Sequence, residues 1–444
     1  MGKLRLDVDP KLELDRKLMS ADQAASLVKS GEQVWIPSSH APVTILAALA
    51  ARGSQVRNVT LRSTILPDFG WFKREAMESF DVQIQYAVQP DARQALADRV
   101  IDFHPYSMIM QHKATDIGRE ESRPLDKLFI IVSPPDEHGW CCVGNACWDA
   151  VSSAKRASMV VAEMSESVVR TCGDSWLHIS QIDALVRVDR PRALLAPLPA
   201  EFEACDRAIA ANVKTLIRDG ATIQIGLGSH TGSLPLLGAF DERNDLTYFG
   251  ELTVPGLVDL ARRGVINGKY GALHPNKFVA SHIGNSLEDL DYIERNPAFE
   301  LHSYEHTNDP RSVAAHDDVV AMNGALMVDL TGQVGVYALG PNVYTGLGGH
   351  LGFAMGAYLA KRGRYITILP ATARGGKVST IVPSFEKGQI ISIPREIADT
   401  VVTDHGIAKL LGRSVRERAL AMIECAAPEF RDELRFQAKK LYWP

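Results

Sequence analysis

Short apolar runs alternate along this chain with segments that have the apolar spacing and end signals of helices. The apolar runs predict strands, and several are apolar throughout, as expected for parallel strands covered on both faces. A helix is expected to begin at Ser20, which has capping-box spacing with Gln23, and another spans 255–264, with Pro near its start and Gly at its end. This alternation predicts a doubly wound α/β architecture. The expected strands are Gln33–Ile36, Val59–Leu61, Leu128–Val132, Met159–Ala162, Ile223–Ile225, Leu246–Phe249, Ala325–Asp329 and Tyr365–Leu369.

Two stretches of the chain share one order of apolar and glycine residues. Leu27–Gly31 in the first and Leu216–Gly220 in the second each precede an expected strand. Each strand then runs into a turn of small residues, Pro37–His40 or Gly226–His230, and an Ala/Leu-rich helix leads to a further strand. Two copies of one βαβ unit predict two α/β domains of related fold. The alternative is that such junctions are common to all α/β proteins.

The boundary between the two copies is expected in the Pro- and Ala-rich stretch Arg190–Pro199. This predicts an N-terminal α/β domain over residues 1–195 and a C-terminal α/β domain over residues 200–444. A length of 444 residues is typical of two or three domains, each large enough to bury a substantial core.

Composition narrows the class of protein. The chain has 48 Lys and Arg against 53 Asp and Glu, a formal net charge of −5, which argues against nucleic acid as the main partner. It has no long apolar run and no apolar segment at its N-terminus, so we expect neither a membrane span nor a secretory signal. Six cysteines indicate a reduced, cytoplasmic protein, and no second Cys/His pair stands at zinc spacing beside Cys142 and Cys147, so no metal site is expected.

The turn Gly226-Leu227-Gly228 is the first candidate for a ligand contact. It follows an expected strand and opens a helix, where glycine lets a backbone approach a ligand and free N–H groups can bind an anion. The third glycine of a dinucleotide fingerprint is missing, because Thr231 stands there and Gly232 comes one place late. A simple tight turn between strand and helix is the alternative.

Glu251 follows the next expected strand, Leu246–Phe249. Ligands of open parallel sheets bind beyond the carboxyl ends of the strands, so Glu251 is expected beside the Gly226–Gly232 turn. A carboxylate there could act as a general base or as a covalent nucleophile. It could equally cap the helix that begins near Pro255.

Three further segments carry candidate groups. Gly346–Gly352 is either a second ligand loop or a flexible connection. In Ser133–Gly139, the side chains of Asp136, Glu137 and His138 are either site groups or parts of a structural turn. His302, His306 and His316 lie within 301–318, which is expected to be a solvated loop. The chain has neither a GxSxG nucleophile elbow nor a P-loop.

Longer motifs in both halves resemble those of the acetyl-CoA hydrolase/transferase family, in particular its 4-hydroxybutyrate CoA-transferase type. The resemblance covers nearly the whole chain, with the motifs in the same order and at compatible spacing. They are Val132–Gly139, Cys172–Ser180, Gln224–Gly228, Gly250–Leu252, Leu273–Lys277, Asn308–Pro310, Asp329–Val334, Gly346–Gly349 and Pro370–Arg374.

The resemblance implies two related α/β domains of the CoA-transferase type with the active site between them. It implies a cytoplasmic homo-oligomer, a dimer or tetramer, with acyl-CoA and small carboxylates as substrates, no permanently bound cofactor, and neither nucleic acid nor membrane as partner. The matching nucleophile is Glu251, which passes through an acyl-glutamyl anhydride to a glutamyl-CoA thioester in a ping-pong reaction. The oxyanion and CoA contacts that it implies are Gly226, Gly228, Ser229, His230, Thr231, Gly232, Asn323, Gly348, Gly349 and Arg374.

The sequence departs from the family pattern near the second glycine loop. Gly352 and Met355 stand where an Asp and an Arg are usual, so the carboxylic acids remain open: 4-hydroxybutyrate-, acetate- or butyrate-like acids and dicarboxylic acids all fit. An acyl-CoA hydrolase that uses the same glutamate is the nearest alternative function. A non-covalent nucleotide- or sugar-phosphate-binding α/β protein is the alternative from another class.

Overall fold

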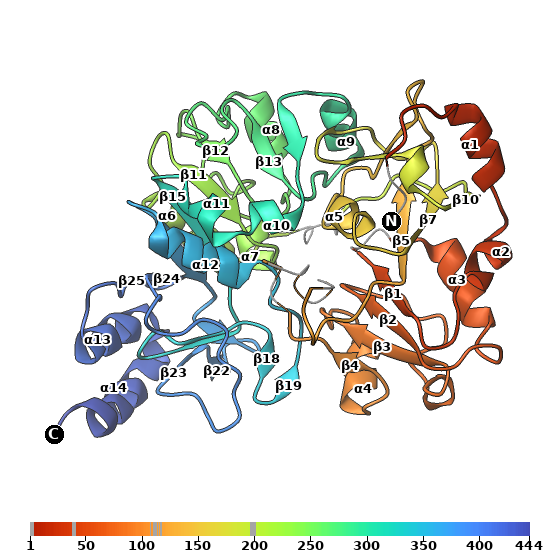
Figure 1. Ribbon diagram of the computed structural model, residues 1–444. Helices are drawn as coiled ribbons and strands as arrows, with labels where there is room; N and C mark the ends of the chain where they lie inside the picture. The colour runs from red at the N-terminus through yellow and green to blue at the C-terminus, as the bar shows by residue number, and fades with distance from the viewer. Residues whose placement is uncertain are drawn as a thin grey trace.

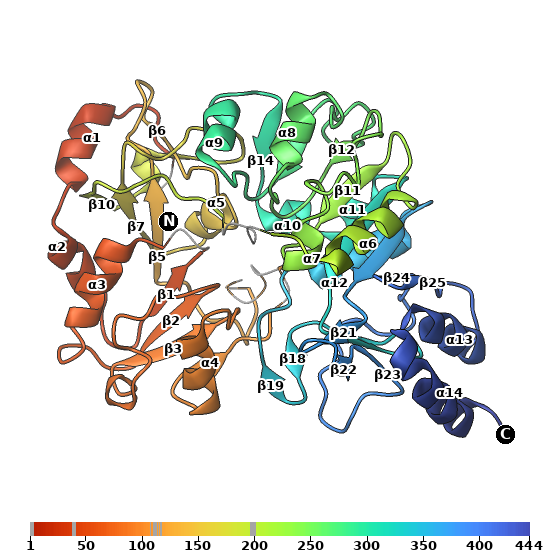
Figure 2. The ribbon, with the colours of Figure 1, turned by 180° about the vertical axis from the view of Figure 1, so that it is seen from behind.

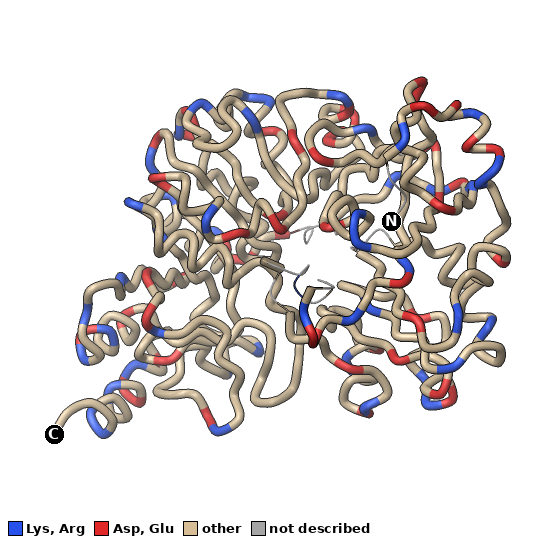
Figure 3. The backbone as a smooth tube through the Cα atoms, viewed as in Figure 1, with Lys and Arg blue, Asp and Glu red and all other residues tan. Residues whose placement is uncertain are grey.

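Two α/β halves lie side by side in the computed structural model of the chain (Figure 1). The structure describes residues 4–37, 41–106, 108–109, 113, 115, 118–195 and 201–444. The first half comprises the described residues up to 195, and the second half those from 201 onward. Figure 2 shows from behind that both halves meet along one face. Acidic and basic residues are distributed over both halves (Figure 3), in keeping with the small net charge of −5.

The first half is built on a seven-stranded sheet of strand order β10-β7-β5-β1-β2-β3-β4, in which all neighbours are parallel. Its inner strands are buried on both faces, as their continuous apolar runs predicted. The strands are β1 Gln33–Ile36, β2 Val59–Ser63, β3 Phe80–Ile84, β4 Asp102–Phe103, β5 Lys127–Val132, β7 Met159–Met164 and β10 Ala184–Arg187. The helices are α1 Pro10–Lys17, α2 Ala21–Ser26, α3 Val43–Ala51, α4 Pro90–Ala97 and α5 Ala150–Ala154.

The second half is built on a six-stranded sheet of order β12-β11-β15-β20-β24-β25, in which only the edge strand β25 is antiparallel to its neighbour. The strands are β11 Thr222–Ile225, β12 Thr247–Tyr248, β15 Val319–Gly324, β20 Arg364–Ile368, β24 Thr400–Thr403 and β25 Gly406–Lys409. The helices are α6 Ala204–Lys214, α7 Ser229–Gly232, α8 Leu257–Arg262, α9 Leu287–Ile293, α10 Tyr304–Thr307, α11 Pro310–Ala314, α12 His350–Leu359, α13 Val415–Cys425 and α14 Pro428–Tyr442.

Smaller elements complete the described chain. They are the strands β6 Trp140–Cys142, β8 Cys172–Gly173, β9 Trp176–His178, β13 Phe278–Ala280, β14 Phe299–Leu301, β16 Met327–Asp329, β17 Val334–Gly335, β18 Ala338–Leu339, β19 Asn342–Val343, β21 Thr372–Ala373, β22 Val378–Ser379 and β23 Ile381–Val382, with the 3-10 turns Arg74–Ala76 and Ile179–Gln181. The helices within the described ranges are all too short or too polar to cross a membrane.

The two sheets repeat one strand order. Strands β10-β7-β5-β1-β2 of the first half correspond in sequence order and neighbours to β24-β20-β15-β11-β12 of the second. This agrees with the predicted internal repeat, which pairs β1 with β11 and β2 with β12. Residues 38–40 of the first predicted turn, and 196–200 at the predicted domain boundary, lie outside the described residues, so the boundary stays a prediction.

Both helix predictions agree with the structure. Ser20 caps α2 and exchanges hydrogen bonds with Gln23 in a capping box. Helix α8 begins after Gly256, and Gly264 follows its end with a positive φ of 80°.

The expected strand 325–329 is wrong in position. The strand that enters the sheet is Val319–Gly324, which lies between β11 and β20. Met327–Asp329 instead forms β16 in a small separate sheet with β17 and β23. Asn323-Gly324 has the composition of a hairpin turn, yet here both residues belong to the parallel strand β15. The expected strand 246–249 is also shorter, because Leu246 and Phe249 make only isolated bridges to other segments.

A third sheet joins the halves. Strand β8 of the first half pairs in parallel with β14 of the second, which pairs with β13. Close by, the N–H of Cys147 donates to the Ser281 carbonyl at 2.8 Å, and the N–H of Ile283 donates to the Asn145 carbonyl at 2.9 Å. One cluster of buried apolar side chains also contains residues of both halves. The position of one half on the other is therefore set by main-chain hydrogen bonds as well as by apolar burial.

Replacement of Gly173 by Ala is expected to weaken this junction. A Cβ at Gly173, which has φ +96°, would overlap the backbone of Leu301 on the paired strand β14. Gly412→Ala is the matched control, because Gly412 has φ +76° and open space around its Cβ position. Both variants carry the left-handed backbone cost of about 1–2 kcal/mol, and Gly173→Ala loses roughly a further 1–3 kcal/mol through overpacking. Urea unfolding measures both, and equal losses would contradict the close approach of β8 to β14.

Candidate active site

A cavity of about 530 Å³ lies between the halves, at the carboxyl ends of strands from both sheets. We call it the central cavity. Residues 64–65, which follow β2, and Tyr86, which follows β3, line it from the first half. The turn after β11, Glu251 after β12 and Asn323 at the end of β15 line it from the second half. The location agrees with the rule that open α/β sheets bind ligands beyond their strand ends.

Glu251 is held in the wall of the central cavity by its main chain and its side chain. Its carbonyl accepts the N–H groups of Ser281 and His282 at 2.9 and 3.0 Å. Its carboxylate accepts a hydrogen bond from Asn308 Nδ2 at 2.7 Å on Oε2 and a further one from the N–H of Gly349. Only 7% of the residue is exposed. The helix-cap alternative is wrong, since α8 begins at Leu257 with Gly256 as its cap residue.

Burial decides the charge state of Glu251. It raises the pKa of the carboxyl from 4.5 to about 7, while the hydrogen bonds from Asn308 and Gly349 act in the opposite direction. The group is therefore ionised in a large part of the molecules at neutral pH, and as an anion it is poorly solvated. A carboxylate with these properties can act as a base or as a nucleophile.

Asn308 is oriented by a chain of buried hydroxyl groups. Its Oδ1 accepts the hydroxyl hydrogen bond of Thr307 at 2.9 Å, which leaves Nδ2 directed at Glu251. The Thr307 hydroxyl in turn lies 2.9 Å from that of Ser281, whose Oγ donates to the His302 carbonyl at 2.7 Å. Sequence reasoning noticed Asn308 within a motif but did not include it among the site residues. Its role follows from contact with a residue far away in sequence.

The loop Gly346–Gly349 passes between Glu251 and the first half. Side chains are excluded at both ends: a Cβ at Gly349 would overlap the Glu251 carboxylate, and one at Gly346 would overlap the carbonyl of Gln85. Gly348 has φ +59°, a left-handed conformation that favours glycine. The predicted ligand loop is thus a close-packed segment that contacts the candidate catalytic carboxylate.

The turn after β11 approaches β15 closely. A Cβ at Gly226 would overlap Oδ1 of Asn323, and this explains the first glycine of the Gly226–Gly228 motif. Asn323 exchanges two hydrogen bonds with Gln224, of 2.9 and 3.2 Å. The short helix α7 then begins at Ser229, so its first N–H groups have no partner within the helix. His230 Nδ1 lies 2.7 Å from Asp206 Oδ1.

The structure brings most of the predicted site residues together. Gly232 is buried within α7 away from the cavity wall, and Arg374 is exposed in the turn after β21, next to Ala373, which does line the wall. The predicted residues that line the central cavity are Gly226, Gly228, Ser229, His230, Thr231, Glu251, Asn323, Gly348 and Gly349.

The first half contributes residues that sequence reasoning missed. Tyr86 is partly buried beside Glu251, and burial together with the charge of Glu251 raises its phenol pKa well above the ordinary value. Among the described residues that line the cavity, Arg93 of α4 is the one Lys or Arg side chain. Its guanidinium lies 4.1 Å from the ring centre of Tyr344. Tyr86 comes two residues after β3, so the strand-end rule that identified Glu251 would also have found it.

Two other expectations resolve differently. In 133–139, Oδ1 of Asp136 accepts the N–H groups of His138 and Trp140 at 2.9 and 2.8 Å, which favours the structural turn. The solvated loop over 301–318 is wrong, because this stretch contains α10 and α11 and His316 is only 2% exposed. The error arose because several polar residues there pack inward against one another.

The raised pKa of Glu251 implies a stability change on its replacement. A carboxyl whose folded-state pKa lies above 4.5 stabilises the fold while it is protonated, and this contribution is lost as the pH rises through about 7. Glu251→Gln keeps the shape without the charge, so it is expected to be more stable than the natural chain by up to about 3 kcal/mol at pH 8.5. The difference should vanish near pH 4.5. Urea unfolding at both pH values measures it, and equal stability at pH 8.5 would contradict the buried anion.

Solved structures resemble the whole chain. RipA from Yersinia pestis superimposes with a TM-score of 0.89 at 29% identity, over 98% of this chain and 100% of that one. The 4-hydroxybutyrate CoA-transferase from Porphyromonas gingivalis gives a TM-score of 0.79 at 27% identity, over 97% of this chain and 100% of that one. The predicted α/β fold class is confirmed by these structures and by the parallel sheets.

Sequence comparison leads to the same group of proteins. The 4-hydroxybutyrate coenzyme A transferase of Clostridium kluyveri is 32% identical over 96% of this chain and 98% of its own length. Other curated relatives are also named CoA-transferases, which confirms the prediction of an enzyme of this class. Residues 5–195 match the acetyl-CoA hydrolase/transferase N-terminal domain, and residues 287–438 match the corresponding C-terminal domain. The chain therefore belongs to the acetyl-CoA hydrolase/transferase family.

Proposed function

We propose that this protein is an acyl-CoA:carboxylate CoA-transferase whose nucleophile is Glu251. The observation that carries the proposal is the carboxylate of Glu251, buried in the wall of the central cavity with a pKa of about 7 and fixed by Asn308 and Gly349. The curated relatives are named for 4-hydroxybutyrate, for succinyl-CoA and cyclohexane-1-carboxylate, or for butyryl-CoA and acetate. These names support a small carboxylic acid as the second substrate.

The first half-reaction loads the enzyme with CoA. A carboxylate oxygen of Glu251 attacks the thioester carbonyl, the carbon–sulfur bond breaks, and an acyl-glutamyl anhydride and CoA thiolate result. The thiolate then attacks the glutamyl carbonyl of the anhydride, which releases the first carboxylate and leaves a glutamyl-CoA thioester. Covalent relay divides one difficult exchange into easier steps.

The second half-reaction runs the same steps in reverse. The acceptor carboxylate attacks the glutamyl thioester, so CoA thiolate leaves and a new anhydride forms. The thiolate attacks the acyl carbonyl of this anhydride, which gives the new acyl-CoA and restores the Glu251 carboxylate. One oxygen atom of Glu251 leaves with the first carboxylate, and one oxygen atom of the acceptor carboxylate replaces it. The Glu251 carboxylate is thereby restored, and no oxidant or reductant is needed.

The glycine-rich segments supply hydrogen-bond donors for the negative charges that develop during these reaction steps. The N–H groups at the start of α7, around Gly228 and Ser229, are donors for the oxyanion that develops on the thioester carbonyl. Gly226, His230, Thr231, Asn323 and Gly348 line the central cavity, where the thioester and the CoA chain would bind, whereas Gly232 and Arg374 do not line it. Gly349 has a distinct role, since its N–H binds the nucleophile itself.

Tyr86 and Gln85 close the site from the first half. The hydroxyl of Tyr86 lies against Gly348 beside Glu251, and burial keeps the phenol protonated. A protonated phenol at this place is a hydrogen-bond donor that the anionic intermediates can use. Transfer rather than hydrolysis requires that a carboxylate or thiolate reach the intermediate before water does, so a site that excludes water would favour transfer.

Trapping of the intermediate tests the nucleophile directly. Incubation of the protein with acetyl-CoA, butyryl-CoA or succinyl-CoA, followed by borohydride or hydroxylamine and peptide mapping, is expected to give a modification at Glu251. Glu251→Ala should lose labelling and transfer together, and Glu251→Asp should retain little activity, because one methylene misplaces the carboxylate. Normal turnover by Glu251→Ala would refute the mechanism. Continued release of free acid and free CoA without an acceptor, beyond one equivalent per chain, would favour a hydrolase.

Asn308→Ala is expected to move the acidic limb of the pH profile. The transfer step requires ionised Glu251, so kcat/KM of the natural chain should fall below about pH 7. Loss of the Asn308 hydrogen bond removes the main influence that lowers this pKa, which shifts the limb upward by about one to two pH units. Thr307→Val is the control, because it disturbs the orientation of Asn308 without removing the donor, and a smaller shift is expected. An active Asn308→Ala variant with an unchanged profile would contradict the assignment.

A further inference from the structure

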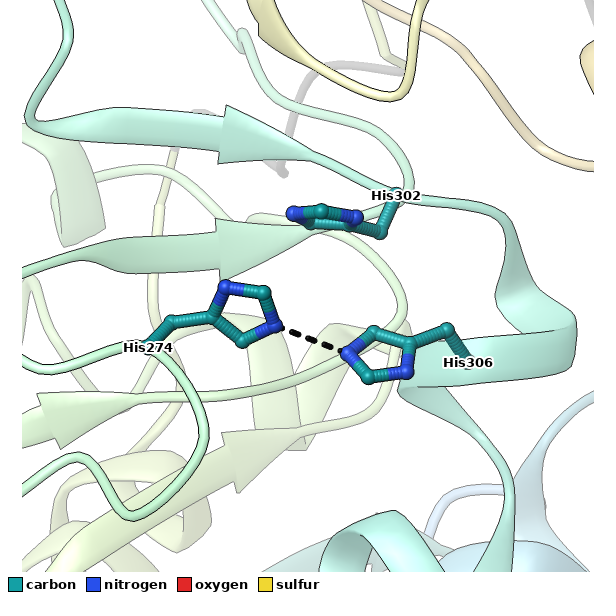
Figure 4. A group of neighbouring side chains, drawn as sticks. All are labelled: His274, His302 and His306. Atoms are coloured by element: carbon teal, nitrogen blue, oxygen red, sulfur yellow. Dashed lines mark hydrogen bonds between the residues drawn. The ribbon is translucent and has the colours of Figure 1, made fainter.

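Three histidines from separate segments gather in the second half, away from the central cavity. His274 precedes β13, His302 directly follows β14, and His306 lies on α10 (Figure 4). Each offers a ring nitrogen within 4.8 Å of those of the other two. The two Nε2 atoms of His274 and His306 lie only 2.9 Å apart. None of the three residues lines the central cavity.

The tautomer of His274 is set by Glu300, which lies on β14. Glu300 Oε2 is 2.9 Å from Nδ1 of His274. An ionised carboxylate only accepts hydrogen bonds, so Nδ1 carries the proton and Nε2 presents a lone pair to the other rings. A carboxylate behind an imidazole in this way is the usual outer partner of a metal-binding histidine.

The charges around the three rings favour a cation. The same Glu300 oxygen lies 3.2 Å from Nε2 of His302. The carboxylates of Asp174 and Asp309 also act electrostatically on His302 and His306. Lys277 is the opposing charge, 3.5 Å from the other oxygen of Glu300. About a fifth of the His274 and His302 side chains is exposed, which leaves a path for an ion.

We propose that His274, His302 and His306 bind one divalent transition-metal ion of the Zn²⁺ type, with Glu300 orienting His274. Imidazole nitrogens are favoured ligands of zinc, and three of them with one further position form a common coordination set. The competing explanation is a direct hydrogen bond between neutral His274 and His306, which also suits 2.9 Å. The proposal does not depend on the transfer reaction.

A second group of possible ligands fits a metal less well. Cys205, Asp206 and His230 also lie within reach of one another. However, burial raises the pKa of the Cys205 thiol to about 11, and Nδ1 of His230 is bonded to Asp206. A thiol must lose its proton to bind zinc. Cys205→Ser therefore provides a matched control.

An ion at the three histidines would fasten α10 to the loop before β13. His306 lies two residues before Asn308, whose side chain donates to Glu251. The N–H groups of Thr307 and Asn308 donate to the carbonyls of Ser303 and Tyr304 in the same helical turn. Metal occupancy is thus coupled to the segment that orients the Glu251 carboxylate. A metal ion at the three histidines would thus affect the position of Asn308, although none of the histidines lines the central cavity.

Metal binding by the full chain tests the proposal. The protein is treated with a chelator, dialysed, and titrated with Zn²⁺ and separately with Co²⁺, whose visible spectrum reports tetrahedral coordination by nitrogen. We expect one ion per chain and a rise in the unfolding temperature on binding. His274→Ala and His306→Ala should lose the ion, and Glu300→Gln should bind about 10–100-fold more weakly. Cys205→Ser and the exposed His138→Ala should bind as the natural chain does.

Two results would overturn the proposal. One is a natural chain that takes up no stoichiometric ion, which would leave the histidines as a hydrogen-bonded cluster. The other is binding that survives in His274→Ala and His306→Ala but is lost in Cys205→Ser. Cooperative unfolding of each variant without metal serves as the check on folding. If His306→Ala does not fold, His306→Gln, which keeps a polar group in place, decides the question by the same titration.

Discussion

Ser281 connects the three parts on which the site depends. Its N–H binds the main chain of Glu251, and its carbonyl accepts the N–H of Cys147 from the other half of the molecule. Its hydroxyl contacts Thr307, which orients Asn308 toward the Glu251 carboxylate. Ser281, which lies in the segment that joins the halves, therefore helps to position both the backbone and the side chain of Glu251. Because interfaces built from such directional bonds have few alternative arrangements, the carboxylate keeps one position relative to both walls of the cavity.

This fixed position includes an electrostatic compromise. A carboxylate that is removed from water loses solvation, and only the hydrogen bonds from Asn308 and Gly349 offset the loss. More donors would make the anion more stable but less reactive, and fewer would leave it protonated at neutral pH. Functional sites commonly sacrifice folding stability for reactivity in this manner. The pKa near 7 expresses that balance.

Much of the architecture was predictable because it depends on local patterns. Apolar runs located the inner strands, and the strand-end rule placed Glu251 at the site. Val319–Gly324 was missed because its final Asn-Gly has the composition of a turn. Asn308 was not identified because contact between segments far apart in sequence, rather than any local pattern, defines its role. Tyr86 was missed because the strand before it, β3, was not among the expected strands. The three histidines follow no zinc spacing either, since they come from the segment before β13, the residue after β14 and helix α10, which only the folded chain brings together.

Gly352 shows how tightly helix α12 is seated on the segment that carries Asn308. A Cβ at this position would overlap the Asn308 carbonyl, so the packing leaves no room for the Asp that related sequences carry there. Restoring that Asp alone would push the nucleophile's hydrogen-bond donor out of place. A side chain at position 352 therefore requires the backbone at Asn308 to shift. Attempts to exchange acyl specificity between relatives should transplant α12 together with α10 and α11, because these helices pack closely against one another.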